Sequence, residues 1–309
     1  MENFKMAVIS NSSSSLPLIG LLAQKKMLVG VLIPDITHQE SIQFAKQLAE
    51  ASITLQQYEG SDVDAPMTAL SAWQCQLGIV FCCSKKIPLE VANLPTYGCV
   101  NLHAASLPEY RGALPLYWQI RHGVTEFQLT AHRLNQDFDT GNIVAQVPVA
   151  IGSYDTIQRV FDSLYQQIPL LVDKLIDQIE CYGQLQENPQ QGEAKHIAPL
   201  ITAQDLEIDW HHISATELCD QVRAGNPVYG GALLRMGQSQ VQLLQATPSS
   251  HLNYGAPPGT IIHISLQEGL IVALKDESVR LDIVANNDGI LGGYRFAQIC
   301  HLSAGMKFT

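Results

Sequence analysis

The chain has 309 residues, 46% of them hydrophobic, and a formal net charge of −11 from 18 Lys and Arg against 29 Asp and Glu. This length allows two domains that each bury a core of their own. Acidic residues exceed basic ones on both sides of residue 200, and nucleic-acid affinity rests on cations that neutralise phosphates. The composition therefore argues against a nucleic-acid partner.

No stretch approaches the roughly 18 consecutive apolar residues of a membrane span, and the start of the chain lacks the layout of a signal peptide. We therefore expect no membrane segment and a cytoplasmic location. The seven cysteines have no paired CxxC spacing, and the histidines, including His211 and His212, have no metal-like partners in the sequence. We expect neither disulfides nor a metal site, and a packing role for Cys82 and Cys83.

The first third of the chain alternates strands with helices. Short apolar runs predict strands over 5–10, 27–34, 53–55 and 77–81, with a helix between the first two and another over 41–51. This alternation predicts an α/β fold with a doubly wound, mostly parallel sheet, whose ligands bind outside the carboxyl ends of the strands. The loop from Phe81 to Pro88 would then lie at the ligand edge.

The middle third continues the sheet with more irregular connections. We predict strands over 99–103, 128–134 and 143–150 and a short helix over 114–122. Pro108, Gly112 and Pro115 interrupt regular structure after the first of these strands. Apolar residues at three- and four-residue spacings predict a long helix over 155–181.

The last third has a different composition. Residues 184–195 are polar, contain Pro and Gly and lack periodicity, so we predict a linker over 184–199 between a domain of residues 1–183 and one of residues 200–309. The second domain has a helical pattern over 214–225. Short Val, Ile and Leu runs alternate with turns after residue 232, which predicts a small, OB-like β-barrel.

Three polar residues in the middle third could form a catalytic site. Asn101 and His103 are two apart on one strand, so their side chains share a face, and Asp139 follows another strand in a turn that ends at Gly141. The amide could donate to a developing oxyanion, the imidazole could exchange protons, and the carboxylate could hold its tautomer. This set suits acyl transfer without a covalent nucleophile.

The motifs around these residues resemble the signature of the folate-dependent formyltransferase family. The similar motifs are Asn101-x-His103, Leu107-Pro108, Tyr110-Arg111-Gly112 and Asp139-Thr140-Gly141. Residues 208–210 and 221–227 resemble the carboxy-terminal barrel of the tRNA and aminoarabinose enzymes of that family. The resemblance implies 10-formyltetrahydrofolate as the donor and Asn101, His103 and Asp139 as the catalytic residues.

The resemblance also implies the binding residues. Those for the folate donor would be Phe81, Cys82, Ile87, Pro88, Leu107, Asn135 and Asp137, and those for the acceptor Arg111, Tyr117 and Trp118. Asp137 could instead form the turn. Arg111 could bind a substrate phosphate or brace its loop, and Tyr117 and Trp118 could pack in the core.

Two departures from the family pattern bear on the acceptor and the folate channel. The stretch Ala105-Ser106-Leu107-Pro108 replaces the usual Ser-Leu-Leu-Pro, and the long basic insertion of the tRNA branch after the second strand is missing. Residues 117–118 and 143–147 are similar to the aminoarabinose branch. The acceptor would then be a small-molecule primary amine, most simply an amino sugar carried on a nucleotide.

By analogy with the family, the amine would attack the formyl carbon directly and form a tetrahedral intermediate. Asn101 and a protonated His103 would stabilise the oxyanion, and Asp139 would favour the charged imidazole. Three alternatives stay open: a methionyl-tRNA formyltransferase, a formyltetrahydrofolate hydrolase and a non-catalytic folate-binding protein. The sequence also leaves a homo-oligomer open.

Overall fold

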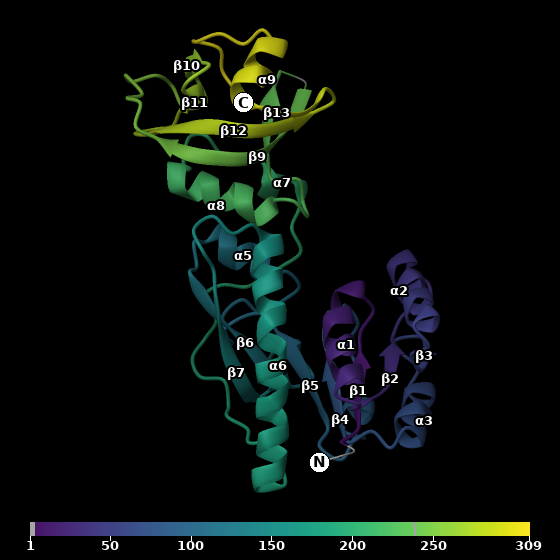
Figure 1. The fold of residues 1–309 in the computed structure, drawn as a ribbon. Helices are drawn as coiled ribbons and strands as arrows, with labels where there is room; N and C mark the ends of the chain where they lie inside the picture. Colours follow the sequence, from purple (N-terminus) through teal and green to yellow (C-terminus); the bar gives the residue numbers. More distant parts are fainter. Residues whose placement is uncertain (1–3, 238) are drawn as a thin grey trace. The chain divides into compact units, whose positions relative to one another are not determined.

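The computed structural model describes residues 4–237 and 239–309, and contacts within the chain divide it into two compact units (Figure 1). The first unit runs to Pro115 and adds Phe127–Val149 and Ser163–Ala198. The second consists of Leu116–Glu126, Ala150–Asp162 and Pro199–Thr309. The exact domain limits at 183 and 200 stay a prediction, since two earlier pieces of chain belong with the carboxy-terminal unit.

The first unit is built on a seven-stranded sheet in the order β3-β2-β1-β4-β5-β6-β7. Its strands are β1 (Met6–Ile9), β2 (Leu28–Ile33), β3 (Leu55–Gln57), β4 (Leu77–Val80), β5 (Cys99–His103), β6 (Glu126–Arg133) and β7 (Ile143–Ala150). The pairings from β3 to β5 are parallel, whereas β5 and β6 are antiparallel. The predicted mostly parallel α/β sheet is confirmed.

Helices connect these strands and cover the sheet. They are η1 (Ser13–Ser15), α1 (Leu16–Gln24), α2 (Gln39–Glu50), α3 (Asp64–Ala72), α4 (Leu89–Ala92) and α6 (Ile157–Tyr182). Every residue of β1 and β4 is buried, as expected for parallel strands covered on both faces. The predictions missed α3, whose residues are mostly small, and α4, which has a single turn.

The second unit contains an antiparallel sheet in the order β10-β11-β12-β9-β8, with β13 beside β12. Its strands are β8 (Ala232–Met236), β9 (Ser239–Ser249), β10 (Ile261–Ser265), β11 (Gly269–Ala273), β12 (Ser278–Asn286) and β13 (Gly289–Gly292). The end of the chain joins the two outer strands: the Met306 carbonyl accepts from the Ile261 N–H, and Arg235 and Thr309 exchange backbone hydrogen bonds. This link gives the unit the predicted barrel-like character.

The helices of this unit are α5 (Pro115–Arg121), α7 (Ala203–Leu206), α8 (Ala215–Gly225) and α9 (Gly293–Ile299). Ser214 caps α8, because its side chain accepts from the Glu217 N–H while the Glu217 carboxylate accepts from the Ser214 N–H. Trp210 stacks on Phe308 inside the core, with ring centroids 6.0 Å apart. Within the described ranges, no helix is both long and apolar enough to cross a membrane.

Candidate active site

The pairing of β5 with β6 brings the polar side chains of the candidate site together. Asn101 faces His132 and His103 faces Thr130 across these antiparallel strands. Facing residues of an antiparallel pair project to the same side, so the side chains of Asn101, His103 and His132 share one face of the sheet. Asp139 lies in the connection from β6 to β7, with a left-handed φ of 56°.

The carboxylate of Asp139 joins these groups. Its Oδ1 lies 3.3 Å from Asn101 Nδ2, 3.5 Å from His103 Nδ1 and 3.4 Å from His132 Nε2. Its Oδ2 accepts the Gly112 N–H at 3.0 Å. Burial alone raises the pKa of Asp139, but the contacts with His132, His103 and the Gly112 N–H outweigh it and hold that pKa below its usual range. Asp139 is therefore ionised at neutral pH.

Two glycines of the sequence motifs are required by this geometry. A Cβ at Gly112, where φ is +125°, would meet the Ala198 carbonyl oxygen at 2.5 Å. A Cβ at Gly141 would meet the Arg133 carbonyl oxygen at 1.8 Å. Both positions allow a close backbone approach that any side chain would prevent, and this is the physical content of the Arg-Gly and Asp-Thr-Gly motifs.

His103 lies in surroundings that disfavour the protonated ring expected from the sequence, whose role in the reaction stays a prediction. Burial lowers its pKa, and this effect outweighs the opposing influence of Asp139 and of the Tyr110 carbonyl. The His103 Nε2 lies 2.9 Å from the Tyr110 carbonyl oxygen, which can only accept, so this nitrogen carries the proton. With the proton on Nε2, Nδ1 is the ring nitrogen that can take up a proton, and it lies 3.5 Å from Asp139 Oδ1.

His132 is the site residue that the sequence did not indicate. It is 2% exposed, and its Nε2 lies 3.0 Å from Asn101 Nδ2. Its Nδ1 lies 2.7 Å from the Arg133 carbonyl oxygen, which assigns a proton to Nδ1. With the proton on Nδ1, the Nε2 atom can accept a hydrogen bond from the Asn101 amide and fix its orientation.

The segment predicted as a linker packs along the site loop. The Gln190 amide donates to the carbonyl oxygens of Asp139 and Gly141, both at 2.8 Å. The guanidinium of Arg111 donates to Gln190 Oε1, which supports the bracing interpretation of this arginine. The Ala198 N–H donates to the Arg111 carbonyl oxygen at 2.8 Å. Gln190 and Ala198 therefore tie the segment over 184–198 to the loops that carry Asp139 and Arg111.

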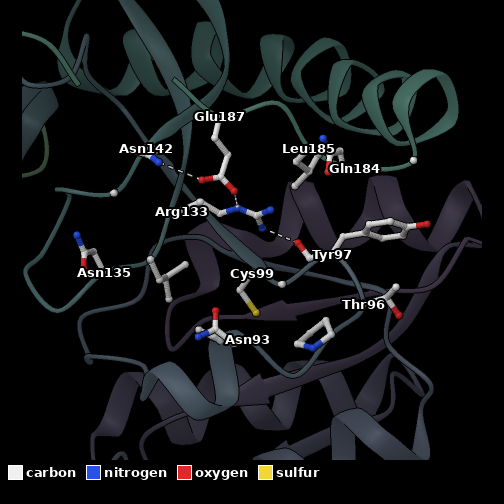
Figure 2. Close-up of a pocket in the computed structure, with 16 residues that line it drawn as sticks. Asn93, Thr96, Tyr97, Cys99, Arg133, Asn135, Asn142, Gln184, Leu185 and Glu187 are labelled. Atoms are coloured by element: carbon white, nitrogen blue, oxygen red, sulfur yellow. Dashed lines mark hydrogen bonds and ion pairs between the residues drawn. The ribbon is translucent and has the colours of Figure 1, made fainter. Parts of the chain in front are cut away.

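A pocket of about 670 Å³ opens beside β5 in the first unit (Figure 2). Its lining includes Ala92, Cys99 and Leu134 and the polar side chains of Asn135 and Glu187. Cys99 is two residues before Asn101 on β5, so the two side chains point to the same side of the sheet. This volume lies in the usual range for a small-molecule site, about 300–1,000 Å³.

Charged side chains in this pocket are paired with one another. Glu187 accepts from Arg133 at 2.7 Å and from Asn142 at 3.1 Å, and Arg133 also donates to the Tyr97 carbonyl oxygen, as Figure 2 shows. A Cβ at Gly98 would lie 2.9 Å from the Arg133 guanidinium. Gly98 therefore leaves space for the cation in the pocket wall.

The expected folate-binding residues lie in different environments, and their roles stay predictions. Asn135 lines the pocket, whereas Phe81, Cys82, Ile87, Pro88, Leu107 and Asp137 are not among its lining residues. Phe81, Ile87 and Leu107 are buried, and Asp137 is exposed. Burial raises the pKa of the Cys82 thiol to about 12 and that of Cys83 to about 11, as expected for unreactive packing residues.

The expected acceptor residues Tyr117 and Trp118 belong to the second unit. Tyr117 is fully buried, and its hydroxyl donates to the Asp205 carbonyl oxygen at 3.2 Å. Trp118 Nε1 donates to the Pro199 carbonyl oxygen at 2.8 Å. Their acceptor-binding role stays a prediction, and the full burial of Tyr117 favours the packing alternative for that residue.

The doubly wound sheet and the convergence of a half-buried amide with a buried imidazole and carboxylate define a candidate group-transfer protein of the α/β class. Residues 8–171 match the family model described as formyl transferase, and residues 200–296 match the one described as formyl transferase, C-terminal domain. The chain belongs to the formyltransferase family.

Curated relatives and solved structures resemble this chain in different ways. A methionyl-tRNA formyltransferase from Paraburkholderia phymatum is 34% identical over 196 residues, or 63% of this chain and 58% of the relative. The match thus spans less than two thirds of that relative's length. A 4-N formyltransferase from Francisella tularensis has a TM-score of 0.61 at 19% identity, covering 77% of this chain and 95% of that one.

A further solved structure resembles nearly the whole chain. It is that of HypX from Aquifex aeolicus in complex with tetrahydrofolic acid, with a TM-score of 0.60 at 17% identity over 95% of this chain and 46% of that one. At these identities the solved structures support the fold alone.

Proposed function

We propose that the protein transfers a formyl group from 10-formyltetrahydrofolate to a primary amine. The observation that carries the proposal is that Asn101 and His103 each lie within 3.5 Å of the Asp139 carboxylate. Membership of the formyltransferase family supports the reaction class.

We place the folate donor on the face of the sheet that carries Asn101 and His103, at the carboxyl end of β5. The loop from Phe81 to Pro88 follows the carboxyl end of the neighbouring strand β4, and Asn135 precedes Asp139 in the connection from β6 to β7. The pocket of about 670 Å³ lies at the amino end of β5, and none of the three catalytic candidates is among its lining residues. When bound, 10-formyltetrahydrofolate would supply the formyl carbon and the nitrogen leaving group.

The residues of this chain would handle the protons and the developing charge. His103 Nδ1, unprotonated in the neutral ring, takes up the proton that the attacking amine loses. The Asp139 carboxylate, 3.5 Å from that nitrogen, stabilises the imidazolium that forms. The proton is then available at Nδ1 for the leaving group, and the ring returns to its neutral form.

Asn101 would stabilise the negative charge that develops on the formyl oxygen. Its Nδ2 lies 3.0 Å from His132 Nε2 and 3.3 Å from Asp139 Oδ1, which together use both N–H bonds of the amide. The longer contact, with Asp139, would give way to the oxyanion, while the contact with His132 keeps the amide oriented. His132 therefore acts as a positioning residue for Asn101.

For the acceptor, we propose an amino sugar carried on a nucleotide. Six Lys and Arg against ten Asp and Glu follow residue 200. Three of these six cations, Arg223, Arg235 and Arg280, form ion pairs with carboxylates of the same unit. Among the described residues, this leaves three unpaired Lys and Arg after residue 200, which is little positive charge there for a phosphate backbone.

Methionyl-tRNA is the second candidate acceptor, because the curated relative quoted above is a methionyl-tRNA formyltransferase at 34% identity. Parallel reactions would separate the two. The purified chain is supplied with 10-formyltetrahydrofolate and either nucleotide-linked amino sugars, methionyl initiator tRNA or no acceptor. Tetrahydrofolate release is followed by absorbance and the product by mass spectrometry.

Each outcome has a distinct meaning. We expect tetrahydrofolate release that depends on an amino-sugar nucleotide and gives a product heavier by one formyl group. Formylation of the tRNA instead would replace the acceptor proposal. Release of formate without any acceptor would indicate a hydrolase, and donor binding without turnover would refute formyl transfer.

A further inference from the structure

Three metal-ligating side chains converge in the carboxy-terminal unit. His251 lies on the connection after β9, His263 on β10 and Glu268 in the turn between β10 and β11. His251 Nε2 lies 3.0 Å from Glu268 Oε1, and His263 Nε2 lies 2.8 Å from Glu268 Oε2. Their ligand atoms all lie within 4.8 Å of one another, an arrangement that metal-ligating groups show nowhere else in residues 4–237 and 239–309.

His263 Nε2 lies close to Glu268 without forming a hydrogen bond to it. The nitrogen is buried and makes no hydrogen bond, although Glu268 Oε2 is only 2.8 Å away. The carboxylate therefore lies off the direction of an N–H bond. A buried polar atom without a hydrogen bond is unfavourable unless another partner satisfies it, and a bound ion is one such partner.

The backbone holds the three side chains in this arrangement. The Ser278 hydroxyl donates to the His251 carbonyl oxygen at 2.6 Å, and the Ser265 hydroxyl accepts from the Glu268 N–H at 3.0 Å. The rings of His251 and His263 stack with centroids 4.8 Å apart and planes inclined by 22°. The Nε2 atoms of both rings thus lie beside the same carboxylate.

We propose that His251, His263 and Glu268 bind a divalent transition-metal ion, with zinc as the best match. Zinc takes imidazole nitrogen and carboxylate oxygen at about 2.0–2.2 Å, and four such ligands in a tetrahedron lie about 3.3 Å apart. The two nitrogen–oxygen distances of 3.0 and 2.8 Å are within a few tenths of an ångström of that separation. Water would complete the coordination.

This site goes beyond formyl transfer and departs from the expectation of no metal. It could not be predicted from the sequence, because the ligands are 12 and 5 residues apart and come from three separate segments. The ion would link the connection over 250–260 to the β10–β11 turn, because His251 and Glu268 would both coordinate it. Its role is therefore to stabilise the carboxy-terminal unit.

Zinc titration of the full chain after chelator treatment tests the proposal. A Cys181→Ser background removes the exposed free thiol as a competing ligand. Calorimetry should give one zinc ion per chain, and the melting temperature should rise with zinc. Glu268→Gln and His263→Ala should each weaken binding more than the roughly 10- to 100-fold that losing even an outer-shell partner costs.

A double change of the exposed pair, His211→Ala with His212→Ala, is the matched control and should leave the zinc affinity unchanged. Glu268→Gln keeps the size of the side chain, so it remains informative if His263→Ala folds poorly. Absence of saturable zinc binding would overturn the proposal. Equal affinity of the background protein and Glu268→Gln would overturn it as well.

Discussion

Replacement of Asp139 by asparagine tests how the carboxylate supports His103. The change keeps the shape of the side chain but removes a charge 3.5 Å from His103 Nδ1. Two unit charges at that distance attract by about 1 kcal/mol at the dielectric constant of water and about 5 kcal/mol at an effective value of 20. At 1.36 kcal/mol per tenfold in rate, these limits correspond to losses of roughly 10-fold and 3,000-fold.

We therefore expect Asp139→Asn to lower kcat/KM by about 10²–10³, between the two electrostatic limits. The pH profile gives an independent readout. The charge of Asp139 raises the pKa of His103, although burial lowers it more, so removing the charge lowers that pKa further. Since the reaction needs neutral His103, the acid limb of kcat/KM should move to lower pH.

The assay is tetrahydrofolate release at saturating donor across the range in which His103 titrates. Asp64→Asn, which removes an exposed carboxylate in the same unit, is the matched control and should leave rate and profile unchanged. An Asp139→Asn enzyme with near wild-type kcat/KM would refute the electrostatic role of Asp139. An acid limb that moves to higher pH would refute the neutral state of His103.

Asn101→Ala should lower kcat by about 10²–10³ with little change in melting temperature, because one oxyanion donor is lost; wild-type kcat would remove Asn101 from that role. Gly112→Ala should destabilise the chain by about 1–3 kcal/mol in denaturant titrations, since its Cβ would meet Ala198 O at 2.5 Å, and unchanged stability would contradict this contact. Gln190→Ala should lower kcat and stability together, because it frees Arg111 and two site carbonyls. Gln191→Ala, at the exposed neighbouring position, is its control. Equal kcat and equal stability of the two variants would refute the role of Gln190 in holding the site loop.

The sequence predicted the fold well where periodicity and composition carry the information. The buried runs that became β1 and β4 and the amphipathic pattern of α6 need no knowledge of distant contacts. The helix α3 was missed because its small residues give a weak amphipathic signal.

The site was predictable only in part. Asn101, His103 and Asp139 could be found from short motifs, and the glycines of those motifs have clear steric reasons. His132 could not, because it joins Asn101 only through the register of β5 with β6. Gln190 lies in a polar stretch without periodicity, and the lowered pKa of His103 depends on burial that no local pattern reports.

Formyl transfer to a primary amine through His103 can be tested in a single reaction with a matched variant. The chain is incubated with 10-formyltetrahydrofolate and a nucleotide-linked amino sugar, in parallel with His103→Ala, and the N-formyl product is quantified by mass spectrometry. We expect N-formyl product with the wild-type chain and a loss of about 10²–10⁴ in rate with His103→Ala. Equal product formation by the two proteins, or formate release in place of an N-formyl product, would contradict it.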